Sequence, residues 1–150
     1  MKSDPIPDTN HVSHYCGGSH VKPDGSISGV AFRLRDLNGK IEEYLSVNWL
    51  EFLRKDDRKS EIDEIRKIFS IKLNRLGSKS KIAVLNVGKT RSHVKRNSED
   101  RRILQVLHEP EKSIDESHSG IHGYRLEDIM IADLIAQSIQ EVHPSKPENS

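Results

Sequence analysis

Three of the eight histidines and the only cysteine of this 150-residue chain fall within residues 11–20, HVSHYCGGSH. These side chains are His11, His14, Cys16 and His20. Zinc prefers histidine and thiolate ligands, but four ligands within ten residues leave little chain for a tetrahedral cage, and no C-x-x-C pair is present. We therefore predict no bound metal and no cofactor. Two interpretations remain: an exposed polar stretch that leads into a hairpin, or a catalytic pair in which His14 stabilises the thiolate of Cys16.

A second histidine-rich segment, DESHSGIHG at residues 115–123, also has residue types that are suited to chemistry. It joins a predicted buried strand to a predicted helix, and connecting segments of this kind commonly carry functional residues. Because the pKa of an ordinary histidine lies near neutrality, His118 is a candidate general base or ligand contact. In the alternative interpretation the segment is a turn whose serines and histidine cap the helix that follows.

The one local surplus of positive charge lies between residues 86 and 102. Six Lys or Arg residues stand against two acids there, and four of them are candidates to bind phosphate: Lys89, Arg91, Lys95 and Arg96. The segment is not a P-loop, because the first glycine of that pattern is replaced by Ala83. It is either a loop that contacts phosphate or a solvated loop. No aromatic side chain is present on which a single-stranded base could stack, which argues against that kind of recognition.

The segment EYLSVNWLEF at residues 43–52 contains the only tryptophan. Trp49 and Phe52 are candidates to bind a partner protein, because tryptophan is enriched at the centres of protein interfaces. In the alternative interpretation both side chains belong to the core.

Composition excludes several classes of protein. A net charge of +1 produces no general attraction to nucleic acid or to a membrane surface, so such binding needs a local patch. No apolar run of about 18 residues exists, so we predict no transmembrane helix. Residues 1–10 lack the apolar region of a signal peptide, and Cys16 alone cannot form an internal disulfide. We therefore expect a cytoplasmic, bacterial-type protein.

The clearest local pattern predicts a β-hairpin after the first histidine segment. Val30, Phe32 and Leu34 alternate as in a strand, the dipeptide Asn38-Gly39 is a strong hairpin signal, and residues 41–47 return as the second strand. Asn48 is then expected to cap a short helix that begins at Trp49.

Longer segments complete the predicted order of elements. Ile62, Ile65, Phe69 and Leu73 recur at helical spacing and predict a helix over residues 60–76 that Gly77 ends. Continuous apolar runs predict buried strands at residues 81–88 and 102–110, joined by a polar loop, and a last helix is expected at 125–142.

This order of elements predicts an α+β fold in two layers. The N-terminal hairpin and two buried strands would form a mixed sheet, packed by two main helices. One domain is expected over residues 11–142, with flexible tails at 1–10 and 143–150.

Two functions fit these observations. In the one we favour, the chain is an accessory or adaptor domain that binds a partner protein either through the predicted helix with Trp49 and Phe52 or through the hairpin. In the alternative, it is a small hydrolase or transferase that acts on a nucleotide or nucleic-acid phosphate. His118 would then be the acid or base, His14 or Cys16 would assist, and the basic segment would hold the phosphate.

Overall fold

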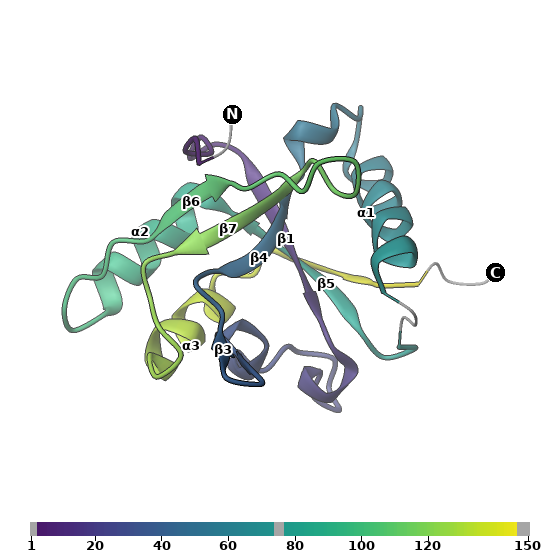
Figure 1. The fold of residues 1–150 in the computed structure, drawn as a ribbon. Coiled ribbons are helices and arrows are strands. Elements are labelled where there is room, and N and C mark those ends of the chain that lie inside the picture. The colour runs from purple at the N-terminus through teal and green to yellow at the C-terminus, as the bar shows by residue number, and fades with distance from the viewer. Residues whose placement is uncertain (1–2, 74–76, 147–150) are drawn as a thin grey trace.

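The computed structural model describes residues 3–73 and 77–146, and a six-stranded sheet lies at its centre (Figure 1). The strands are β1 (His11–Cys16), β4 (Leu45–Trp49), β5 (Lys81–Asn86), β6 (Gln105–His108), β7 (His118–His122) and β8 (Glu141–Pro144), in the spatial order β6-β7-β4-β1-β5-β8. Within the described residues every pairing is antiparallel, so the expected mixture of parallel and antiparallel strands is not found.

Helices pack on this sheet, and the predicted α+β class is confirmed. The α-helices are α1 (Arg58–Lys72), α2 (Val87–Asn97) and α3 (Ile129–Gln137), and the short 3₁₀ helices are η1 (Gly18–His20), η2 (Gly29–Phe32) and η3 (Glu51–Leu53). Among the described residues, no helix combines the length and the apolar character needed to cross a membrane.

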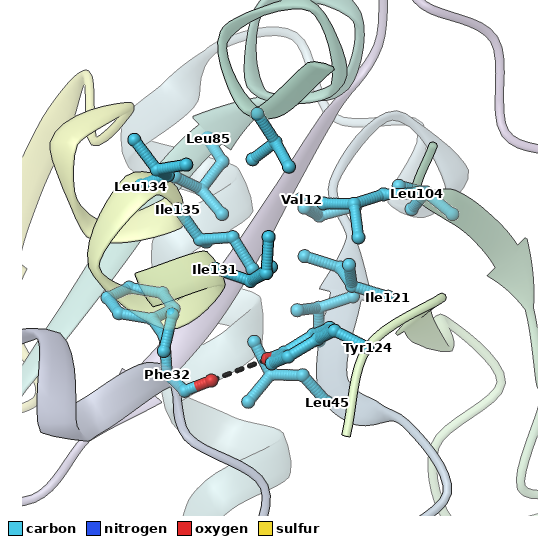
Figure 2. Packing of buried hydrophobic residues seen from close by; sticks show 14 of the residues in the cluster. Val12, Phe32, Leu45, Leu85, Leu104, Ile121, Tyr124, Ile131, Leu134 and Ile135 are labelled. Carbon is cyan, nitrogen blue, oxygen red and sulfur yellow. Dashed lines mark hydrogen bonds between the residues drawn. The ribbon is translucent and has the colours of Figure 1, made fainter. Parts of the chain in front are cut away.

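The alternation of β5 shows how the sheet divides the core. Ala83 and Leu85 belong to the larger apolar cluster, which contains side chains of α2, α3 and η2. Ile82 and Val84 point the opposite way, into a smaller cluster beneath α1. Figure 2 shows part of the larger cluster, with Phe32 of η2 packed near α3. The buried strand predicted at 81–88 is therefore found over Lys81–Asn86, while Val87 and Gly88 begin helix α2.

The predicted N-terminal hairpin is only partly correct. Asn38 and Gly39 both have positive φ angles and connect two short strands, β2 (Asp36–Leu37) and β3 (Lys40–Ile41), which form a separate two-stranded sheet. The expected strand around Val30 is instead the 3₁₀ helix η2. Ser28 starts this helix, since its hydroxyl accepts the Val30 N–H at 3.2 Å, and such local side-chain bonds compete with strand pairing.

Two further expectations between residues 48 and 102 were wrong. Asn48 lies inside β4 rather than capping a helix, and only the 3₁₀ helix η3 follows it. The expected polar loop after residue 88 is mostly helix α2. Asn86 caps it by accepting the Lys89 N–H at 2.9 Å, and the buried residues Val87 and Val94 lie on one face.

The longer predicted helices are found with shifted ends. Helix α1 begins at Arg58, two residues before the predicted start, because Asp57 is its cap: the Asp57 carboxylate accepts the Ser60 N–H. It ends at Lys72, and the expected continuation over 74–76 lies outside the described residues. Helix α3 is shorter than the predicted 125–142, and β6 is shorter than the predicted 102–110.

The segments expected to be tails are paired with the sheet where they are described. Residues 3–6 run along the outer edge of β6, where Ile6 is buried and its N–H donates to the Val106 carbonyl at 2.9 Å. At the other end, His143 and Pro144 belong to β8, which pairs with β5. Residues 1–2 and 147–150 of the expected tails lie outside the described residues.

Candidate functional site

The segment HVSHYCGGSH does not form a polar lead-in, because its first six residues are β1, a central strand between β4 and β5. Its side chains alternate between the two faces of the sheet. Val12 and Cys16 are buried in the larger cluster, and His14 faces the same way, since its ring lies 4.9 Å from that of Phe32. The histidines of this segment are therefore spread over both faces of one strand and the helix η1 that follows.

His14 is held by two backbone carbonyls. Its Nδ1 lies 2.8 Å from the Ser46 oxygen, and its Nε2 lies 2.7 Å from the Ala31 oxygen. Burial lowers the pKa of His14 below its ordinary value, although the two carbonyls oppose this shift. The neutral ring has one N–H and donates to one of these carbonyls, and both ring nitrogens face backbone groups of the protein, which indicates a structural role.

The lowered pKa of His14 predicts a loss of stability in mild acid. The unfolded chain takes up a proton near pH ~6.5, while the folded chain resists protonation until lower pH. The free energy of unfolding should therefore fall as the pH drops below about 6.5, by at most about 1.4 kcal/mol per pH unit from this residue. His14→Gln should flatten the slope in urea titrations between about pH 7 and 5. A variant with the wild-type slope would contradict this assignment.

Cys16 is fully buried, and this burial raises the pKa of its thiol to about 12. A thiol with such a pKa is protonated at neutral pH and is a poor nucleophile. Cys16 is therefore part of the apolar core.

His118 lies in β7 and faces away from both of these residues. It pairs with Asn48 of β4, and Asn48 pairs with Ser13 of β1. Because directly paired residues share a face, His118 points to the side of Ser13, opposite to His14. The structure thus does not bring His118 into one cleft with His14 or Cys16.

The two candidate partner-binding aromatics lie in different surroundings. Trp49 donates its indole N–H to the Asn10 side-chain oxygen at 2.8 Å, and its ring packs edge-on against His108, 5.2 Å away. It therefore helps to fix the segment before β1. Phe52 lies in η3, 5.6 Å from the Trp49 ring, and remains 37% exposed.

The basic segment lies on helix α2, and the helix separates its four candidate residues. Arg91 is committed to other contacts, since it donates to the Leu104 carbonyl at 2.8 Å and pairs with Asp8 at 2.9 Å. Lys95 is exposed outside any groove described here. Lys89 and Arg96, two turns apart on one face of α2, line a common groove.

This groove has a volume of about 620 Å³ and lies between α2 and the C-terminal end of α3. The described residues that line it are Asn86, Gly88, Lys89, Ser92, His93, Arg96, Gln137, Ser138 and Gln140. None of these residues is acidic. By contrast, the cavities beside α1, beneath the loop at 113–117 and at the N-terminal end of α3 each include at least two carboxylates.

The groove presents charged side chains rather than the amide groups of the helix terminus. The first N–H groups of α2 are already bonded: Val87 to the Asn10 carbonyl, Gly88 to the Asp8 carbonyl, and Lys89 to the Asn86 side chain. Lys89 and Arg96, in contrast, form no ion pair with another described residue. Their charges are therefore available to a ligand.

His93 lines the groove, and two hydrogen bonds fix the orientation of its ring. The Asn97 amide donates to its Nδ1 at 3.2 Å, so its Nε2–H is the donor to the Gln137 oxygen, 2.8 Å away. His93 thus connects α2 with α3. His93 was not among the site residues predicted from the sequence, although Lys89, His93 and Arg96 have the spacing of one helical face. No sequence pattern predicts that α3 forms one wall of the groove, because that depends on how the two helices pack.

Within the described residues, no group of three or more His, Cys, Asp or Glu side chains is placed to hold a metal ion. Comparison of the chain with models of protein families, with curated proteins and with solved structures finds no match.

Proposed function

We propose that the protein binds a phosphate-bearing ligand, a nucleotide or a nucleic-acid strand, in the groove between α2 and α3. The observation that carries this proposal is the lining: two cations without an ion-pair partner in the described chain, and no carboxylate among the described lining residues. Charge-assisted hydrogen bonds from Lys and Arg to phosphate are about twice as strong as neutral ones. The guanidinium of Arg96 also matches two phosphate oxygens at once.

Neutral donors complete the complement of groups that phosphate needs. Ser92 lies between the two cations in sequence, and the amide side chains of Gln137 and Gln140 line the opposite wall. Because the net charge of the chain is only +1, attraction of an anion depends on this local patch. We therefore expect affinity to fall as ionic strength rises.

The other functional expectations stay predictions. His118 faces the side of the sheet opposite to the cluster that contains α2 and α3, so we propose binding at the groove and no reaction there. A partner protein at Phe52 and a cytoplasmic location have no structural observation of their own that favours them.

The proposal is tested by measuring the affinity for pyrophosphate, ATP and a short oligonucleotide by isothermal titration calorimetry. We expect Lys89→Ala and Arg96→Ala each to weaken binding by about tenfold, which corresponds to about 1.4 kcal/mol. Lys95→Ala is the matched control, because it removes one positive charge from an exposed position of the same helix. Equal losses in Lys89→Ala and Lys95→Ala would show that charge alone, and not the groove, attracts the anion. No binding by the wild-type protein would refute the proposal.

A further inference from the structure

A group of polar side chains lies on the face of the sheet opposite to the groove, around β4 and β7. The Tyr44 ring lies 4.7 Å from the His122 ring and 6.0 Å from the His118 ring. Gly120 makes this arrangement possible, because a Cβ atom there would lie 2.3 Å from Tyr44. The tyrosine ring therefore packs directly on the backbone of β7, with an imidazole on each side of Gly120 in the strand.

Glu109 fixes both imidazoles. Its carboxylate lies 2.9 Å from Nε2 of His122, and its backbone carbonyl lies 2.8 Å from Nδ1 of His118. In the neutral rings these nitrogens carry the hydrogens, because a carboxylate and a carbonyl only accept. Nδ1 of His122 and Nε2 of His118 then keep their lone pairs, and neither atom is bonded to another described residue.

Of the two groups in the Glu109–His122 contact, the carboxylate of Glu109 is the more buried. Its side chain is only 10% exposed, whereas His122 is 25% exposed and reaches solvent. A buried carboxylate behind a partly exposed imidazole sets the tautomer of the ring and stabilises the cation that forms when the ring takes up a proton. The Tyr44 ring packs against this imidazole, and no hydrogen bond of the Tyr44 hydroxyl is found among the described residues.

The charges around this site favour an uncharged substrate. Burial raises the pKa of Tyr44, and the negative charges of Glu109, Glu111 and Glu43 raise it further, while Lys72 opposes them. Three carboxylates against one ammonium group repel phosphate esters. This electrostatic character is the opposite of that in the groove between α2 and α3.

We propose that Glu109 and His122 form a general-base pair for hydrolysis of an uncharged carboxylic ester on this face of the sheet. His122 Nδ1 removes a proton from water while the water oxygen attacks the ester carbonyl carbon. The carbon–oxygen bond to the leaving alcohol then breaks, and the proton on His122 passes to the alkoxide, so that ester and water become acid and alcohol. Tyr44 donates to the carbonyl oxygen as negative charge develops there. Glu109 is a positioning residue.

The first test measures hydrolysis of p-nitrophenyl acetate at about pH 8. His122→Ala should lower the rate at least tenfold, since a positioned base contributes about 10²–10⁴-fold. Tyr44→Phe keeps the ring on Gly120 and should also lower the rate. His143→Ala is the matched control: this histidine is 28% exposed and its Nε2 lies 2.8 Å from a Glu141 oxygen. Equal rates in wild type and His122→Ala would overturn the proposal.

The second test separates positioning from general damage to the fold. Histidine ¹⁵N NMR should show His122 with its hydrogen on Nε2 and His118 with its hydrogen on Nδ1. In Glu109→Ala, His122 should become a mixture of tautomers, while His118 keeps its form because the backbone carbonyl remains. Wild-type His122 with its hydrogen on Nδ1 would refute the pair. Lys89→Ala should weaken phosphate binding but hydrolyse the ester at the wild-type rate, so one proposal can be refuted while the other stands.

Discussion

Replacing Asp115 with alanine should lower the free energy of unfolding by about 3 kcal/mol, near the lower end of the range for breaking a buried ion pair. The Asp115 side chain is fully buried. It accepts hydrogen bonds from the Asn48 amide at 2.8 Å and from the Ser117 hydroxyl at 2.9 Å, and Lys72 Nζ lies 3.1 Å away. Removing the carboxylate takes the main acceptor away from a buried amide and one partner away from an ammonium group.

The expected loss is not larger because Lys72 has a second partner, Glu111, at 2.7 Å. Glu111→Ala is therefore the matched control: it removes a carboxylate from the same lysine, but one that is 42% exposed. We expect it to lower the free energy of unfolding by less than about 1 kcal/mol. Urea unfolding followed by circular dichroism measures both variants. Equal losses would show that the buried bonds of Asp115 contribute nothing beyond a surface ion pair.

The same network explains why the predicted helix cap at Asn48 was wrong. Asn48 followed by Glu51 has the pattern of a helix cap, yet Asn48 is a mid-strand residue. Its amide is satisfied by Asp115, which is 67 residues away in sequence. An asparagine side chain can bond to nearby backbone as a helix cap, but here it bonds to a residue that is distant in sequence instead. No sequence window of ordinary length contains both residues.

Elements that depend on local physics were predicted well. The apolar run at 81–88 indicates a strand covered on both faces, and β5 has an apolar cluster on each side. The turn at Asn38-Gly39 depends only on two residues that tolerate positive φ. The lengths of its strands depend on pairing with the rest of the sheet, and there the prediction was wrong.

β1 and α2 were missed for different reasons. In β1, His14 occupies a position that faces the core, and its partners are carbonyls of η2 and β4. In α2, only Val87, Thr90 and Val94 are buried, which is a narrow face for a helix. The surplus of positive charge could be located from the sequence. Which of its residues share a face could not be predicted, because Lys89 and Arg96 are separated from Arg91 and Lys95 only once the segment is known to be a helix.

The prediction with the second large effect concerns Phe32, which sequence analysis placed in a strand and the structure places in η2. Phe32→Ala should lower the free energy of unfolding by about 3–5 kcal/mol. The side chain is fully buried, and the Phe32 carbonyl accepts a hydrogen bond from the buried Tyr124 hydroxyl (Figure 2). Helix α3 lies against the same segment, since a Cβ on Gly29 would approach the Asp133 Cα to 3.2 Å. Alanine therefore leaves a cavity between two closely packed elements that cannot easily collapse.

Val30→Ala is the matched control for Phe32→Ala, because Val30 lies in the same 3₁₀ helix and is 40% exposed. It should change the free energy of unfolding by no more than about 0.5 kcal/mol. Phe32→Leu keeps much of the apolar volume and should lie between the two. Thermal unfolding of the three variants in parallel ranks them directly. If Phe32→Ala costs no more than Val30→Ala, the ring does not pack in the core, and residues 29–32 do not hold α3 against the sheet as the structure indicates.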